Sequence, residues 1–143
     1  MKFVVENEKK LFEKTWNVIE PKIMPGLSFG LIGELGAGKT TLVQYIAKKL
    51  GATEKVTSPT FLMQKKYQLR NQHNISALVH IDLYRMFHPK KKDLREFVSW
   101  LEDPAAVVFV EWADKITNQD YFDCIIKITP VGETSRRVDI KWN

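Results

Sequence analysis

The chain has 143 residues, of which 44% are hydrophobic and 27% charged, a balance typical of soluble globular proteins. This length suffices for a hydrophobic core, so a single domain covering residues 1–143 is expected. The sequence contains no apolar run long enough to cross a bilayer, and its first residues are too few and too charged for a signal peptide. These features exclude a membrane-spanning protein and make the cytoplasm the expected location.

The net charge of +5 permits an anionic partner such as RNA but does not require one. The densest basic cluster is residues 90–92, and so short a run is more often a solvated face or a helix start than a binding patch. The chain has one cysteine, Cys124, which lies in an apolar run. An internal disulfide or a cysteine-based metal site is therefore excluded, and a buried, inert thiol is expected.

The first half of the chain alternates strands with helices. The spacing of apolar residues predicts a strand over 2–5, a helix over 7–19, a strand over 27–32 and a helix over 41–50. The side chain of Asn7 is suited to cap the first helix. Gly51 is suited to end the second helix, because glycine readily adopts the conformation that follows a last helical turn.

The second half is richer in strands. It predicts strands over 61–69 and 76–83 around a turn at 71–74, a helix over 93–101, and strands over 105–111, 121–129 and 136–142. The first two strands resemble an antiparallel hairpin, and the continuous apolar run at 105–111 is typical of a buried central strand. Because the last strands follow without intervening helices, the sequence predicts a three-layer α/β domain with antiparallel strands beside a parallel centre.

Residues 33–40 form a complete phosphate-binding loop with the spacing G-x-x-x-x-G-K-[ST], between a predicted strand and a predicted helix. Its glycines allow successive N–H groups to point at phosphate oxygens, and the helix start adds a positive dipole end. Lys39 is expected to reach the β- and γ-phosphates, and the Thr40 hydroxyl to ligate Mg²⁺. The predicted nucleotide-binding residues are Gly33, Glu34, Leu35, Gly36, Ala37, Gly38, Lys39, Thr40 and Thr41.

Hydrolysis of a bound nucleotide needs a carboxylate at the end of a neighbouring strand, where the ligand crevice of such a sheet opens. Two acids occupy such positions, since Asp82 follows the run 78–81 and Glu111 follows the run 107–110. Either acid could hold Mg²⁺ while the other orients the attacking water. The sequence leaves their roles open.

Other polar residues near these strands have two interpretations each. The hydroxyl groups of Thr57, Ser58 and Thr60 either contact the γ-phosphate as a switch loop does or form a plain surface turn. Arg85 either stabilises transition-state charge or pairs with surface carboxylates. Trp112 packs near the nucleotide, near a partner or in the core. A strand histidine such as His80 is more often packed than a proton shuttle.

Read together, these segments resemble the TsaE (YjeE) family, small ATPases of bacterial tRNA threonylcarbamoyladenosine biosynthesis. The resemblance is carried by Gly33–Thr41, Ser58–Phe61, the H-x-D-x-Y-R element at His80–Arg85, and Glu111 with Trp112. The phosphate loop is shared by a very large superfamily, whereas the elements after it are much more specific.

The resemblance implies a P-loop fold that binds ATP, with Thr40 and Glu111 at Mg²⁺ and Asp82 beside the γ-phosphate. It also implies slow hydrolysis that is coupled to a complex with the TsaD and TsaB proteins, which modify adenosine 37 of tRNA. Two alternatives remain: a small-molecule or nucleoside kinase, and a docking module whose nucleotide is structural. The kinase is less favoured, because little chain follows Glu111 to build an acceptor pocket.

Overall fold

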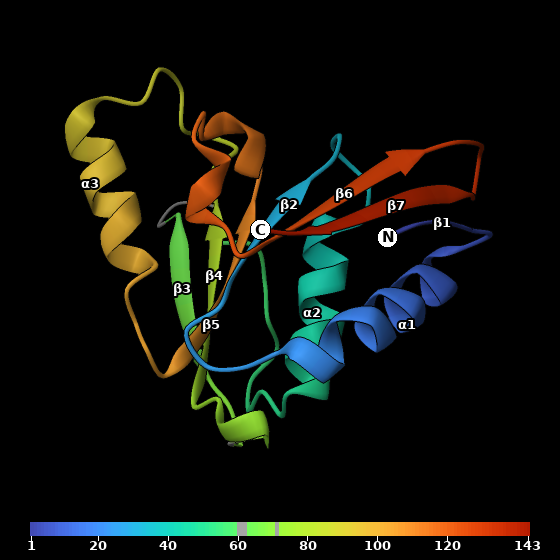
Figure 1. Cartoon of the computed structure of the whole chain (residues 1–143), viewed down its shortest axis with the longest axis horizontal. Helices are drawn as coiled ribbons and strands as arrows, with labels where there is room; N and C mark the ends of the chain where they lie inside the picture. The colour runs from blue at the N-terminus through green and yellow to red at the C-terminus, as the bar shows by residue number, and fades with distance from the viewer. Residues whose placement is uncertain (60–62, 71) are drawn as a thin grey trace.

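The structure is a computed structural model and describes residues 1–59, 63–70 and 72–143. In these residues seven strands form one sheet in the order β1-β7-β6-β2-β5-β4-β3 (Figure 1). The strands are β1 (Lys2–Val5), β2 (Ser28–Ile32), β3 (Gln64–Gln68), β4 (Ala77–Asp82), β5 (Ala106–Glu111), β6 (Cys124–Pro130) and β7 (Arg136–Trp142). The helices are α1 (Glu8–Ile19), α2 (Lys39–Lys49) and α3 (Lys91–Trp100).

The sheet is mixed, as the sequence predicts, although the strand expected over 121–129, which is β6, pairs parallel with β2 without a preceding α-helix. Its four central strands, β4, β5, β2 and β6, run parallel to one another, while β3, β7 and β1 pair antiparallel at the two sides. The chain passes from β5 to β6 through two short 3₁₀ turns, η3 (Ala113–Lys115) and η4 (Gln119–Tyr121), and not through an α-helix. The parallel centre places the carboxyl ends of β2, β4 and β5 at one edge of the sheet.

Two hydrophobic clusters cover the two faces of the sheet and create three layers (Figure 1). On one face, α1 and α2 pack on the sheet, where the rings of Phe29 and Phe109 stack with centroids 4.7 Å apart. On the other face, Phe97 of α3 packs against Phe122, with ring centroids 6.1 Å apart. The expected three-layer α/β fold is therefore confirmed.

Local side-chain contacts explain where the elements begin. Asn7 caps α1 as expected, because its side chain accepts a 2.9 Å hydrogen bond from the backbone N–H of Lys10. The basic run at 90–92 is a helix start: the Asp93 carboxylate accepts from the Lys90 N–H at 2.8 Å as α3 begins. The strand expected from residue 121 begins only at Cys124, because the preceding residues form η4.

The hairpin expected around residues 71–74 is confirmed, since β3 and β4 pair antiparallel. Asn71, in that turn, and Thr60, expected in the switch loop, lie outside the described residues. None of the helices in the described ranges is both long and apolar enough to cross a membrane. The thiol of Cys124 is buried, and burial raises its pKa to about 12.

Candidate nucleotide-binding site

A pocket of about 450 Å³ opens where the phosphate-binding loop meets the carboxyl ends of β4 and β5. The predicted site residues that line it are Leu35, Gly36, Gly38, Lys39, Thr40, Thr41, Ser58, Asp82, Arg85, Glu111 and Trp112. The structure thus brings together residues that are up to 77 positions apart in the sequence, from Leu35 to Trp112. A pocket of this size is in the range that small-molecule ligands occupy.

The phosphate-binding loop has the backbone shape that its glycines permit. Gly36 and Gly38 have φ angles of +77° and +107°, in the left-handed region that other residues rarely adopt. A Cβ atom on Gly33 would lie 2.9 Å from the carbonyl oxygen of Ile128, so this glycine lets the loop approach β6 closely. The helix α2 begins directly after Gly38, two residues earlier than predicted. The unpaired backbone N–H groups of its first turn therefore lie at the pocket, where they suit an anion.

Lys39 is held inside this loop. Its Nζ donates to the carbonyl oxygens of Gly33 at 2.6 Å and Glu34 at 2.9 Å, and lies 4.2 Å from the ring centroid of Trp112. Burial lowers the pKa of Lys39, and the negative charges of nearby carboxylates, Glu111 first, oppose that shift. The hydrogen-bond acceptors of Lys39 here are neutral, and a phosphate would add the attraction of an opposite charge to this buried cation.

Thr40 and Glu111 meet at the floor of the pocket. The Thr40 hydroxyl lies 2.8 Å from both carboxylate oxygens of Glu111, which is 2% exposed and ends β5. Octahedral Mg²⁺ with oxygens at 2.0–2.1 Å places adjacent ligand oxygens about 2.9 Å apart. The separation of these oxygen atoms therefore fits two neighbouring ligands of Mg²⁺.

Asp82 ends β4 directly opposite Glu111 in the parallel register. Its carboxylate accepts hydrogen bonds from the Ser58 hydroxyl at 3.1 Å and from the Tyr84 N–H at 2.9 Å. The described residues contain no group of three or more His, Cys, Asp or Glu side chains that would hold a metal alone. Mg²⁺ at this site would take further oxygens from water and phosphate, which is its usual coordination in phosphate sites.

The remaining predicted loop residues support the site from behind. Gly33 and Glu34 supply the carbonyl groups that hold Lys39, and Ala37 is buried in the core. Thr57 is exposed and does not line the pocket. Its backbone N–H donates a hydrogen bond to the Tyr67 hydroxyl, and that hydroxyl donates one to the Thr57 carbonyl oxygen. Of the two described hydroxyl residues expected in a switch loop, Thr57 and Ser58, only Ser58 lines the pocket.

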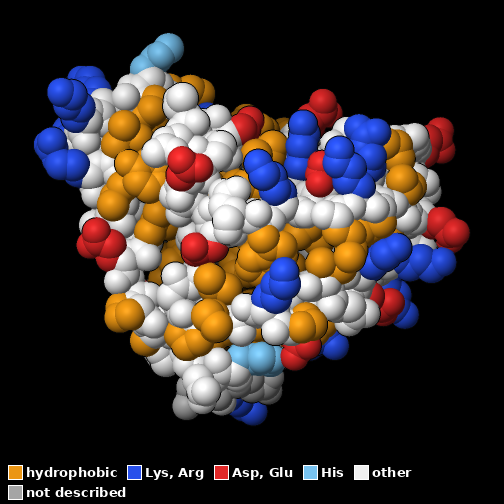
Figure 2. All heavy atoms as spheres, in the orientation of Figure 1, with side chains coloured by type: hydrophobic (Ala, Val, Ile, Leu, Met, Phe, Trp, Pro, Cys, Tyr) orange, Lys and Arg blue, Asp and Glu red, His pale blue; other side chains and the backbone are white. Residues whose placement is uncertain are grey.

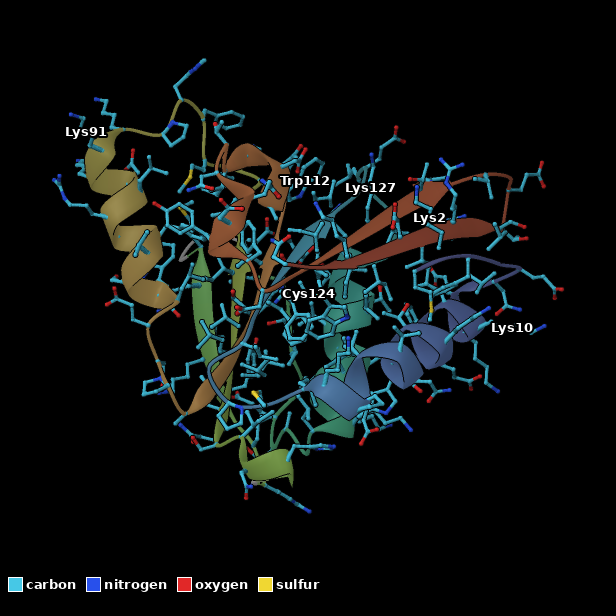
Figure 3. The ribbon with its side chains drawn as sticks, in the orientation of Figure 1. Lys2, Lys10, Lys91, Trp112, Cys124 and Lys127 are labelled. Carbon is cyan, nitrogen blue, oxygen red and sulfur yellow. The ribbon has the colours of Figure 1, made fainter. Side chains whose placement is uncertain are left out.

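Trp112 follows Glu111 with a φ of +58°, so the chain turns sharply as β5 ends. Figure 3 marks it beside the turn that follows this strand. Its ring contacts Lys39 on one side and lies 5.2 Å, between centroids, from the Tyr84 ring. Trp112 therefore forms a wall of the pocket, and Arg85 lines the same pocket.

Sequence analysis assigned no specific role to His80, which the structure joins to this site. Its Nε2 lies 2.5 Å from Oε2 of Glu111, and its side chain is fully buried. The available signal was its position two residues before Asp82, which places both side chains on one face of β4. What the sequence could not supply was the register that sets His80 diagonal to Glu111.

A family model described as threonylcarbamoyl adenosine biosynthesis protein TsaE matches residues 5–138 of the chain. Proteins named tRNA threonylcarbamoyladenosine biosynthesis protein TsaE are similar to it in sequence. The one from Nostoc is 34% identical over 112 residues, covering 77% of this chain and 67% of its own. The one from Mycobacterium tuberculosis H37Rv is 36% identical over 117 residues, with 76% and 67% covered.

The fold is also similar to a solved structure, that of YdiB from Bacillus subtilis. The two chains superpose with a TM-score of 0.67 at 26% identity, covering 99% of this chain and 84% of YdiB. The similarity therefore includes the strands and loops that form the pocket, not only the phosphate-binding loop.

Proposed function

The chain belongs to the TsaE family, and we propose that it is a slow, Mg²⁺-dependent ATPase of tRNA N6-threonylcarbamoyladenosine biosynthesis. One observation carries this proposal: Lys39, Thr40 and Glu111 converge on one pocket at the start of α2. We also propose that residues 1–143 act as a single ATPase domain. The family model supports a single domain, because it matches residues 5–138 as one continuous segment.

In the proposed reaction, the loop N–H groups and Lys39 bind the phosphates of ATP. Lys39 would exchange the carbonyl oxygens of Gly33 and Glu34 for phosphate oxygens, whose negative charge attracts its ammonium group. Thr40 and Glu111 would hold Mg²⁺, which supplies positive charge against the charge that develops on the phosphate oxygens.

The oxygen of a water molecule then forms a bond to the γ-phosphorus, and the bond from that phosphorus to the β–γ bridging oxygen breaks. One water proton stays on the attacking oxygen, the other passes to another oxygen of the phosphate product, and ADP and phosphate leave. Asp82 is the residue we assign to orient the water, because it stands beside Glu111 and is linked to Ser58 of the preceding loop. One carboxylate orients water while the other attends the metal, so each of the two adjacent acids has a separate task.

We propose that this cycle is coupled to TsaD and TsaB homologues, as the family resemblance implies, and that tRNA is engaged indirectly through their complex. Exposed apolar side chains at the pocket support a protein partner, because the lining residues Leu35 and Tyr84 are 77% and 46% exposed. On the face that Figure 2 shows, basic side chains gather at the start of α3 and over β6 and β7.

The test compares wild type with Glu111→Gln in ATP hydrolysis and in formation of the modified nucleoside by TsaD and TsaB homologues on tRNA. We expect the partners to stimulate hydrolysis by wild type, and Glu111→Gln to bind ATP but to support neither stimulated hydrolysis nor repeated modification. Glu102→Gln, the same substitution at an exposed site before the other end of β5, is the matched control. Modification sustained by Glu111→Gln would indicate a docking role and contradict the proposal.

A further inference from the structure

We infer that His80 is a positioning residue that fixes the Glu111 carboxylate for Mg²⁺ without touching nucleotide or metal itself. The inference rests on the proposed function of the pocket. His80 is fully buried and does not line the pocket, so its action on a ligand has to pass through another residue. Glu111 lines the pocket and contacts His80 at 2.5 Å, which makes it that residue.

The register of the sheet creates this contact. In the parallel pair of β4 and β5, His80 stands opposite Phe109 and Asp82 stands opposite Glu111. His80 is therefore the diagonal neighbour of Glu111 on the same face, a separation that a long side chain can bridge. Leu78, the preceding residue on this face of β4, packs in the cluster beneath α1 and α2. His80 is thus a polar side chain at a position of the core where the pattern of β4 would place an apolar one, directly behind the pocket.

The hydrogen-bond pattern defines what His80 does. A carboxylate only accepts hydrogen bonds, so Nε2 is the donor to Oε2 of Glu111. The other ring nitrogen, Nδ1, is buried and has no hydrogen-bond partner among the residues that the structure describes. The hydrogen bond to Glu111 is therefore the one polar contact that the His80 side chain makes among these residues.

The two partners of Glu111 act on different sides of its carboxylate. His80 holds Oε2 from inside the sheet, and the Thr40 hydroxyl contacts both oxygens from the side of the pocket. When Thr40 and Glu111 turn their oxygens to a metal ion, His80 is the contact that still fixes the carboxylate. Groups that orient a metal ligand in this way typically change metal affinity or activity about 10- to 100-fold when they are removed.

A purely structural histidine would not need this partner. An apolar residue at position 80 would continue the pattern set by Leu78, whereas His80 instead adds a buried hydrogen bond to Glu111. Of the two buried side chains, Glu111 is the one that lines the pocket. This placement ties the pair to the metal position.

The experiment measures the affinity for a non-hydrolysable β,γ-imido analogue of ATP by calorimetry, with saturating Mg²⁺ and with EDTA. The ratio of the two dissociation constants is the metal gain. We expect His80→Leu to lower the metal gain about 10- to 100-fold, toward that of Glu111→Gln, and to leave the affinity in EDTA unchanged. In the Glu111→Gln background, His80→Leu should cause no further loss, because the residue acts only through that carboxylate.

Two further variants keep the test decisive if His80→Leu folds poorly. The side-chain amide of glutamine can occupy the place of Nε2, so His80→Gln should retain most of the metal gain, while the shorter His80→Asn should lose it. Retention of the gain in His80→Leu and His80→Asn, with loss in Glu111→Gln, would overturn this inference alone. Wild type without any metal gain would refute the proposed function as well.

Discussion

Replacing Lys39 with methionine should separate nucleotide binding from stability. Methionine keeps an unbranched apolar chain and removes the charge and its donors. In the structure Lys39 is 4% exposed and bonds two backbone carbonyls, and burial lowers its pKa. If ATP binding exchanges these bonds for phosphate contacts, Lys39→Met loses at least one charge-assisted hydrogen bond, about 1.5–3 kcal/mol. This loss corresponds to a roughly 10- to 150-fold weaker affinity for ATP.

The same substitution has a second, pH-dependent consequence. The pKa of Lys39 is lower in the folded chain than its ordinary value of 10.5, so the unfolded chain binds more protons between these two values. The free energy of unfolding of wild type should therefore rise with pH through that window, relative to Lys39→Met. Below the lowered pKa, the variant avoids the cost of a buried charge.

Calorimetry with ATP and urea denaturation across pH measure these two effects. Lys48→Met is the matched control, because Lys48 lies on the same helix but is exposed near its other end. It should change neither ATP affinity nor the pH dependence. An unchanged affinity in Lys39→Met would refute the assignment of the phosphate site.

Three further substitutions or modifications test other parts of the site and core. Gly38→Ala should lower the free energy of unfolding by more than about 1 kcal/mol in urea denaturation, because alanine is strained at a φ of +107°. Gly132→Ala is the control, since the φ of Gly132 is not positive. Equal losses in the two variants would contradict this reason. Asp82→Asn should slow hydrolysis while ATP affinity persists, and an unchanged rate would remove Asp82 from the reaction. Cys124, with a pKa of about 12, should react with a thiol reagent at pH 8 only as the chain unfolds, and rapid labelling of the folded chain would contradict its burial.

The features that sequence predicted well are local ones. The spacing of residues 33–40 determines a loop that needs only a strand before it and a helix after it, and the structure has both. The cap at Asn7 depends on the N–H three residues later, at Lys10. The strand order was harder, because β6 joins the parallel centre through 3₁₀ turns, and such turns lack the periodicity that marks a helix.

Long-range contacts at the site were less accessible. Glu111 was a candidate because it ends an apolar run, but nothing in that run identifies His80 as its partner. The contact depends on the register between two strands, which spacing along one chain does not specify. The hydrogen bonds between the Tyr67 hydroxyl and both backbone groups of Thr57 were also missed. The pattern of the strand indicates only that Tyr67 is a core side chain, and it does not identify the segment that its hydroxyl reaches.

The most direct test of the account is single-turnover release of phosphate from ATP, with protein in excess over nucleotide and Mg²⁺ present. Wild type should convert the bound ATP to ADP and phosphate, and EDTA should stop the reaction. Glu111→Gln should bind the same ATP and release phosphate at least tenfold more slowly, roughly the loss expected when a metal-attending carboxylate is removed. Equal release by the two proteins would contradict the assignment of Glu111, and no release by wild type would contradict the ATPase itself.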